Sequence, residues 1–320
     1  MPPIIRPATS TEAIIRDSLT HGAWGQPLTQ PQFLERERCL RAHSWSKHAM
    51  VMWFGVHAET SEVLASCETF RMKALQEGKQ AISYGIASVF TEEKHRGRGH
   101  ASAVIRGAMD QLEGATPQTP VSFHLYSEVG APIYERLGFK PLPSEEWLIP
   151  TAASLKPLAG TTRAQRLTER DSLSPLLERY SSLNAGLLVV PDLLHLDWHW
   201  ERSRIYGRLL NRRQPRFLAL VADDAYSIWT VDYKNNILRA LLFVSHRIDA
   251  TAAMLWDASQ EAEFLRIPYL SVWHTPATMP ADVVDSLRAV AGVILAPRVG
   301  ELAMVRPHLD LSEVPRALWV

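Results

Sequence analysis

Cysteine is scarce in this sequence, and no run of residues is both apolar and long enough to cross a membrane. Only Cys39 and Cys67 occur among the 320 residues, and their separation fits neither a CxxC redox pair nor a structural zinc cluster. The first residues also lack the apolar segment of a signal peptide. These absences exclude a disulfide scaffold and a membrane protein, and we expect a cytoplasmic protein.

Net charge is absent too, since 34 Lys and Arg residues balance 34 Asp and Glu residues. Such a chain has no overall field that attracts nucleic-acid phosphates or anionic lipids, so we expect neither as a partner. The length predicts about two domains. A stretch rich in Thr, Ala, Pro and Ser divides the chain into a first domain over 1–150, a linker over 151–160 and a second domain over 161–320. The oligomeric state stays open.

Hydrophobic periodicity predicts an α/β protein with a mixed sheet. In the first half, two helices precede a three-strand meander, a long helix, a strand and a short helix. These are expected over 11–18, 31–43, 50–57, 63–73, 81–90, 101–112, 120–126 and 131–137. The second half repeats the order of meander, helix and strand over 217–221, 225–233, 237–245, 250–264 and 269–273. It lacks the glycine loop of the first half, which suggests a degenerate repeat.

That glycine loop is the strongest motif, and it joins a strand to the long helix over 101–112. It reads Arg96-Gly97-Arg98-Gly99-His100-Ala101. Glycines allow several backbone N–H groups to converge on an anion at a helix N-terminus. A Walker loop would need Gly-Lys followed by Ser or Thr, and a dinucleotide fingerprint would need glycine where Ser102 stands. A tight turn without any ligand is the alternative.

The pattern Arg96-x-x-Gly99-x-Ala101, followed by Tyr134 and the Gly138-Phe139 pair, resembles the GCN5-related N-acetyltransferase (GNAT) superfamily. The resemblance implies a GNAT fold with a β-bulged, splayed central sheet, acetyl-CoA as cosubstrate and no metal. Tyr134 would be the general acid and touch the cofactor, unless its ring only packs. The other implied cofactor-binding residues are Val89 and Phe90, which offer their backbone to the pantetheine, and Arg96, Gly97, Arg98, Gly99, His100, Ala101 and Ser102 around the pyrophosphate.

Three shorter segments are similar to fungal lysine N6-acetyltransferases of lysine catabolism. They are Ser66 to Thr69, Val89 to Thr91 and Leu125 to Gly130. The resemblance implies that a small amine, with lysine or a lysine-like amine first, attacks the thioester directly in a ternary complex. Another small amine or secondary metabolite is an alternative acceptor. A catalytically inactive CoA-binding sensor is the alternative from a different class.

The general base is not assigned, because Ser83 stands where related enzymes often carry a strand glutamate. Glu68, His124 and Glu128 are the alternatives for a catalytic role, and an ordered water can also relay the proton. Glu68 and Glu128 are equally candidates for binding the ammonium of the substrate. Cys67 reads as a buried strand cysteine rather than a nucleophile, since no pattern ties a histidine to it.

A histidine- and tryptophan-rich stretch over 191–201 is the main candidate in the second half. On a helix His195 and His199 lie one turn apart, which suits a metal. A zinc protease would need glutamate at position 196, where Leu196 stands, so we expect no metal. The remaining alternatives are simple packing and a wall of the acceptor pocket. In the latter case the substrate-binding residues would be Asp197, Trp198 and Trp200.

Overall fold

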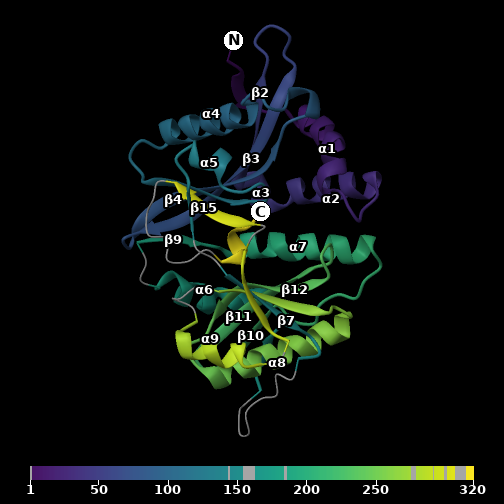
Figure 1. Cartoon of the computed structure of the whole chain (residues 1–320), viewed down its shortest axis with the longest axis vertical. Helices are drawn as coiled ribbons and strands as arrows, with labels where there is room; N and C mark the ends of the chain where they lie inside the picture. The colour runs from purple at the N-terminus through teal and green to yellow at the C-terminus, as the bar shows by residue number, and fades with distance from the viewer. Residues whose placement is uncertain are drawn as a thin grey trace.

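The protein is described from a computed structural model that covers residues 2–142, 145–153, 163–183, 186–274, 279–290, 292–298, 301–306 and 315–320. In these residues the chain forms two mixed sheets, each with its own helices, stacked along the long axis of the molecule (Figure 1). The predicted α/β class with mixed sheets is confirmed.

The first sheet is built around a long antiparallel meander. Its strand order is β1-β2-β3-β4-β5-β15-β6, and β9 pairs with β3. Among the described strands of this sheet, β4 and β5 are the pair that runs in parallel. The bounds are β1 Ile4–Pro7, β2 Met50–Val56, β3 Val63–Gln76, β4 Lys79–Phe90, β5 Val121–Ser127, β6 Lys140–Pro141, β9 Leu187–Val190 and β15 Leu302–Arg306.

Helices cover both faces of this sheet. On one face α4 (His100–Ala115) and α5 (Pro132–Glu135) pack on Ile86 and Phe123, whose side chains point the same way. The opposite face carries α1 (Ser10–Trp24), α2 (Gln30–Ala42) and α3 (Ser44–Ala49). Thr9 caps α1 in a capping box with Glu12, so the helix begins at Ser10, one residue before the predicted start.

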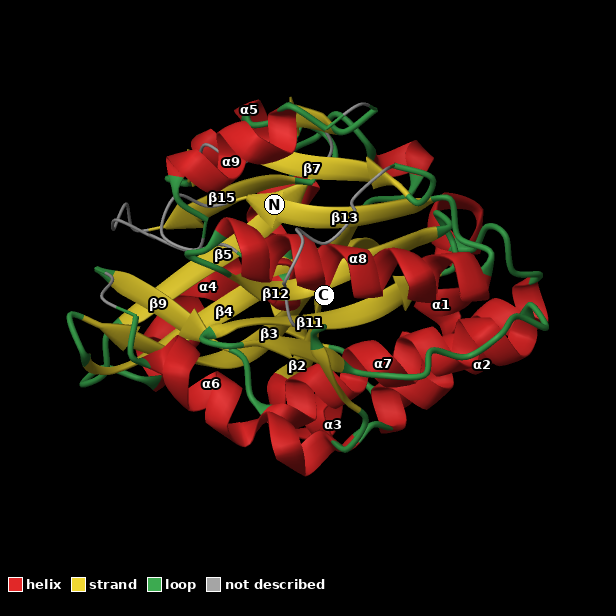
Figure 2. Cartoon of the chain, turned by 90° about the horizontal axis from the view of Figure 1, so that it is seen from below, coloured by secondary structure: helices red, strands yellow, loops and turns green. Residues whose placement is uncertain are grey.

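The second sheet has the order β14-β7-β13-β12-β11-β10-β8. Its strands are β7 Glu145–Pro150, β8 Gln165–Leu167, β10 Ala219–Ala222, β11 Ala225–Asp232, β12 Ile237–Val244, β13 Tyr269–His274 and β14 Ile294–Pro297. Helix α7 (Leu193–Leu209) lies between the two sheets, while α8 (Ile248–Leu265) and α9 (Ala281–Arg288) cover the outer face (Figures 1 and 2). The remaining elements are α6 Ser174–Ser181 and the short helices η1 Glu93–His95, η2 Arg170–Leu173 and η3 Arg316–Leu318.

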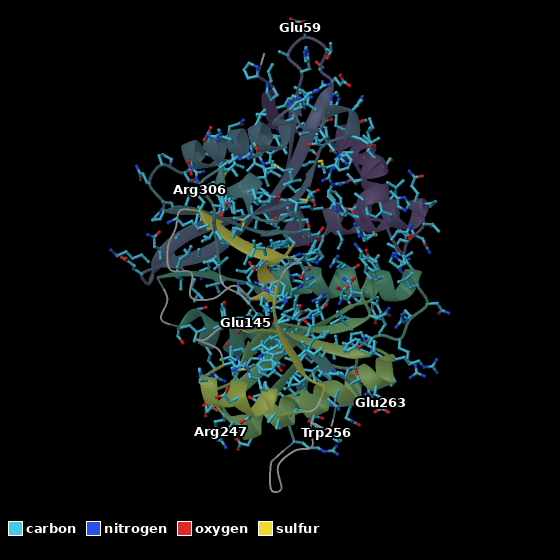
Figure 3. All side chains as sticks on the ribbon, in the orientation of Figure 1. Glu59, Glu145, Arg247, Trp256, Glu263 and Arg306 are labelled. Atoms are coloured by element: carbon cyan, nitrogen blue, oxygen red, sulfur yellow. The ribbon has the colours of Figure 1, made fainter. Side chains whose placement is uncertain are left out.

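The two halves exchange one strand in each direction. Strand β7, which precedes residue 150, pairs with β13 and β14 of the second sheet. Strand β15, near the other end of the chain, inserts between β5 and β6 of the first. In Figure 3, Arg306 at the end of β15 therefore lies in the first half and Glu145 at the start of β7 in the second. The division into 1–150 and 161–320 does not match the sheets, and most of the expected linker lies outside the described residues.

The second half repeats the plan of the first. Strand β12 pairs antiparallel with β11, with a bulge between Ile228 and Trp229, and then pairs in parallel with β13 beyond α8. Only Ser245, His246 and Arg247 separate β12 from α8, and none of them is glycine. This topology agrees with the predicted repeat that lacks a glycine loop.

Candidate active site

Strands β4 and β5 part from each other in the middle of the first sheet. Their parallel pairing runs from Ile82 with Val121 to Ile86 with Leu125 and ends there. Beyond that point β4 continues through Ala87 to Phe90 and β5 through Tyr126 and Ser127. The strands thus leave a V-shaped opening whose arms carry backbone groups that no longer pair with each other.

A β-bulge lies on the β4 arm of this opening. Glu68 of β3 pairs with Ala87, whereas Ser66 pairs with Phe90, so Ser88 and Val89 together face a single residue of β3. Ser88 has a φ of 53°, a conformation that non-glycine residues rarely adopt. Bulges of this kind redirect the backbone of a strand. The predicted bulged and splayed central strand is confirmed.

Arg16 of α1 contacts the bulge and holds it in place. Its side chain is buried, and its Nη2 donates a hydrogen bond of 2.6 Å to the carbonyl oxygen of Ser88. Its Nη1 lies 3.4 Å from a carboxylate oxygen of Glu68. The guanidinium also lies over the ring of Trp24, which contacts Phe90 edge-on at 5.8 Å. One arginine therefore ties α1 to β3 and to the β4 arm of the opening.

Asp17, the next residue along α1, extends the charged network and was not predicted as a site residue. Both of its carboxylate oxygens accept hydrogen bonds of 2.9 Å from Nη2 of Arg41. Burial raises the pKa of Asp17 to about 6, although Arg41 opposes the shift, and the nearby carboxylates of Glu37 and Glu68 add to it. The sequence gives no sign that Asp17 joins this network, because an aspartate next to an arginine on a helix is not a recognisable motif.

The glycine loop leads into an uncapped helix N-terminus. Gly97 and Gly99 have φ values of 75° and 78°, and a Cβ at either position would meet open space. No side chain of the described residues caps α4, so the first N–H groups of this helix are free to bind an anion. The Arg96 side chain donates to the carbonyl oxygen of Thr91, which closes the loop on the end of β4. This loop fits a pyrophosphate.

The residues predicted to bind CoA line up along this route. Val89 and Phe90 form the partly exposed end of β4, and Arg96, Gly97, Arg98 and Gly99 are exposed. His100, Ala101 and Ser102 form the first turn of α4. Burial, together with the nearby His95 and Arg98, lowers the pKa of His100, which favours its neutral form at neutral pH.

Tyr134 lies on the same face of the sheet as α4, packed edge-on against Phe139. It is 7% exposed, and burial, with the neighbouring Cys67 and Glu128, raises its pKa to about 12. The phenol is therefore protonated at neutral pH and can donate a proton. Glu128 is exposed just beyond β5. Cys67 is fully buried and burial raises its pKa to about 12, which confirms its interpretation as a strand cysteine.

Glu68 and His124 lie on the other face of the sheet, the face of α1 and α2. Glu68 is 7% exposed and is engaged by Arg16. His124 lies where β4 and β5 still pair, and its Nδ1 is 2.9 Å from Oγ of Ser83. Burial lowers the pKa of His124 to about 4, so it is neutral and a weak base at pH 7. Of these two candidates, only Glu68 stands beside the opening.

The helix predicted to offer a pocket wall serves mainly to pack the two halves together. Trp200 is buried in the core of the second half and donates to the carbonyl oxygen of Trp229. Trp198 packs on Trp45 and Phe70. Asp197 is held by ion pairs. Trp200 thus packs in a core, and its predicted role in substrate binding stays a prediction. The partners of Asp197 are Arg170, Arg204 and His43.

The histidines of α7 also pack. His195 stacks on Trp45 with ring centroids 4.0 Å apart, and His199 donates to the carbonyl oxygen of Ala317 at 2.9 Å. Among the residues covered, no group of three or more histidine, cysteine or acidic side chains is arranged to hold a metal ion. Within the same residues no helix has the length and apolarity needed to span a membrane.

Comparison with known proteins shows which families this chain is similar to. Residues 142–299 match the family model of the LYC1 GNAT-like C-terminal domain. A lysine acetyltransferase of Yarrowia lipolytica is 24% identical, over 74% of this chain and 76% of that protein. A probable N-acyltransferase of Enterococcus faecalis shares 14% identity at a TM-score of 0.62, and a GCN5-related N-acetyltransferase of Kribbella flavida 19% at 0.58. Each of these two structures covers 95% of this chain and is itself covered over 72% of its length.

The overall fold is that of GCN5-related N-acetyltransferase structures, and residues 142–299 match the GNAT-like C-terminal domain of the LYC1 type.

Proposed function

We propose that this protein transfers the acetyl group of acetyl-CoA to the amine of a small molecule, with lysine or a lysine-like amine as the first acceptor. The observation that carries the proposal is the meeting of three features at one opening in the first sheet. They are the bulge at Ser88, the uncapped α4 behind Gly99, and the protonated phenol of Tyr134.

The α4 side of the opening suits the nucleotide part of acetyl-CoA. The free N–H groups of the first turn of α4 and the loop at Gly97 and Gly99 would hold the pyrophosphate. The backbone of Val89 and Phe90, which lies past the end of the pairing with β5, would bind the amide groups of the pantetheine arm. When bound, acetyl-CoA supplies the activated acyl group, and the chain itself supplies its binding and orientation.

The acceptor amine must lose a proton before it can attack. For a lysine-like amine with a pKa of about 10.4, holding the neutral form at pH 7 costs roughly 4.6 kcal/mol. Glu68 and Glu128 are the sequence-predicted candidates for receiving this proton, directly or through water, and Asp17 joins them because its raised pKa makes it a better base. The neutral amine would attack the thioester carbon, and Tyr134 would protonate the departing thiolate.

The preference for a small acceptor rests on the second half and on the relative. Strand β15 extends the first sheet beside β5, and residues of η3 and α7 pack on the sheet face that carries Glu68, which favours a small acceptor over a polypeptide. The relative from Yarrowia lipolytica is named as a lysine acetyltransferase. Both observations favour lysine over a protein substrate.

The test is a screen of free amino acids, diamines and polyamines with acetyl-CoA, with release of the CoA thiol as the readout. We expect thiol release that depends on the amine, with lysine among the best acceptors. If another small amine is the sole acceptor, the proposed acetyltransferase activity stands but lysine is not the acceptor. Calorimetric binding of acetyl-CoA with no turnover for any amine would instead favour the CoA-binding sensor, which the replacement of a strand glutamate by Ser83 motivates.

A further inference from the structure

Arg298 is a buried arginine that forms no ion pair with any residue the structure describes. It follows β14, is 5% exposed, and its guanidinium lies 3.6 Å from the centroid of the Trp273 ring. Its Nε and Nη1 are buried and find no hydrogen-bond partner in the described part of the chain. Nε1 of Trp273 is also buried and unpartnered there. Three N–H donor atoms of two stacked side chains therefore lack an acceptor.

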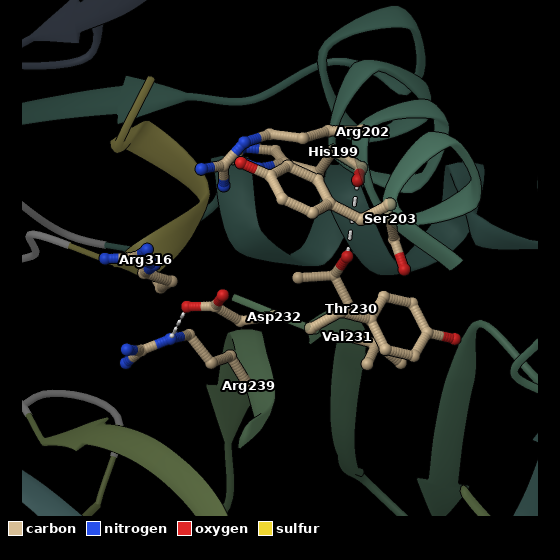
Figure 4. A pocket seen from close by; sticks show the side chains of 10 residues that line it. His199, Arg202, Ser203, Thr230, Val231, Asp232, Arg239 and Arg316 are labelled. Atoms are coloured by element: carbon tan, nitrogen blue, oxygen red, sulfur yellow. Dashed lines mark hydrogen bonds and ion pairs between the residues drawn. The ribbon is translucent and has the colours of Figure 1, made fainter. Parts of the chain in front are cut away.

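The nearby acidic groups are already paired with other arginines. Glu301 binds Arg316 at 2.6 Å. Arg239 binds both Asp232 and Glu146 at 3.0 Å, and its contact with Asp232 is drawn in Figure 4. Leaving a buried charge unpaired is costly, because the charge loses its contacts with water and gains no hydrogen bond in return. An arginine kept in such surroundings indicates a bound anion.

The polar cavity shown in Figure 4 does not supply the place for this anion. It is lined by His199, Arg202, Asp232, Arg239 and Arg316 and has a volume of about 20 Å³. That volume holds about one water molecule, and Arg298 is not among its lining residues. An organic anion that contacts Arg298 therefore does not occupy this cavity.

Arg298 lies beside the proposed acceptor side of the opening. Its guanidinium is 5.7 Å from the ring of Tyr126, and Tyr126 contacts Trp273 at 5.3 Å. Tyr126 belongs to the β5 arm, just past the last residue that pairs with β4. Its side chain packs with Ala87 and Phe70 on the face opposite Tyr134. By strand alternation Glu68 shares that face, about two strand spacings or at least roughly 10 Å away.

We propose that Arg298 and Trp273 bind the α-carboxylate of the acceptor amino acid, which rests on the acetyltransferase function proposed above. A guanidinium can bind a carboxylate through two parallel hydrogen bonds, and the indole N–H can add a third. The rings of Tyr126 and Trp273 would pack against the start of the side chain. A flexible four-carbon stem would then carry the amine of lysine from Arg298 toward the bulge and Glu68. The proposed acceptors are therefore α-amino acids whose side chains end in an amine.

The test compares L-lysine with cadaverine, which keeps the amine but lacks the carboxylate. In the wild type we expect kcat/KM for L-lysine to exceed that for cadaverine roughly 10- to 100-fold. Arg298→Gln should remove this preference by lowering only the value for L-lysine, and Trp273→Phe should lower it less. The matched control is Arg288→Gln, which removes an exposed arginine of α9 and should change neither value.

Two outcomes would overturn the proposal. Equal loss for both acceptors in Arg298→Gln, with unchanged binding of acetyl-CoA, would assign Arg298 a purely structural role. Equal use of both acceptors by the wild type would show that no carboxylate is recognised. If no amine is acetylated, the proposed function fails, but calorimetry with L-lysine still tests whether Arg298 binds a carboxylate. Binding that Arg298→Lys weakens and Arg298→Gln abolishes supports the carboxylate site, and no binding to the wild type refutes it.

Discussion

The Nη2 atom of Arg16 donates a hydrogen bond of 2.6 Å to the carbonyl oxygen of Ser88, the residue with positive φ at the bulge of β4. Through this bond helix α1 holds the backbone on one arm of the opening between β4 and β5. The same guanidinium engages Glu68 and so links the bulge to a candidate acid–base group. The proposed acceptor side of the opening is therefore built from α1, β3 and β4 together.

Replacing Arg16 by methionine should impair both stability and turnover. The change leaves Glu68 buried without its partner, which costs about 3–5 kcal/mol, and it releases the bulge. Misplacing the reacting groups should lower kcat on the order of 10- to 100-fold. Urea unfolding and steady-state kinetics measure the two effects. The double variant Arg16→Met with Glu68→Gln should recover stability but not kcat, and recovery of both would contradict a positioning role.

Tyr134→Phe tests proton donation to the leaving thiolate. The substitution removes one hydroxyl from a packed ring, so the free energy of unfolding should change little. Loss of a general acid lowers kcat by about 100-fold or more. Calorimetry should find acetyl-CoA affinity nearly unchanged. An unchanged kcat would show that the tyrosine only packs.

Gly99→Ala tests the pyrophosphate loop. Gly99 has a φ of 78° immediately before α4, and a left-handed conformation costs a non-glycine residue roughly 1–2 kcal/mol. The loop would shift to relieve this strain, and we expect acetyl-CoA to bind roughly tenfold more weakly. Gly114→Ala is the matched control, since it lies in the same helix with open space around its Cα and no positive φ. Equal affinities for the two variants would argue against the loop.

Asp17 should make stability depend on pH between about 4 and 6. Its pKa in the folded protein, about 6, is above the ordinary value of 3.8, so the folded state favours the protonated carboxyl. The resulting stability is present below pH 3.8 and is lost as pH rises through 6, by up to about 3 kcal/mol. Asp17→Asn should lack this fall. Parallel curves of unfolding free energy against pH for the two proteins would contradict the shifted pKa.

Local patterns in the sequence predicted the parts of the site that depend on short segments. Hydrophobic periodicity predicted the meander and helix α4, and Gly97 and Gly99 predicted the loop between them. The bulge was predicted from the family resemblance. The exchange of β7 and β15 could not be predicted, because it pairs residues more than 100 positions apart. Arg16 and Arg298 were missed for the same reason, since their roles arise from contacts with Ser88, Tyr126 and Trp273 that no local spacing reveals.

The most direct test of the central claim is mass spectrometry of the products formed from acetyl-CoA and L-lysine. The account predicts that the wild-type protein converts L-lysine to the singly acetylated amino acid with one CoA released per product, and that Tyr134→Phe slows this conversion. Tight binding of acetyl-CoA with no acetylated product from L-lysine or from any other small amine would contradict it.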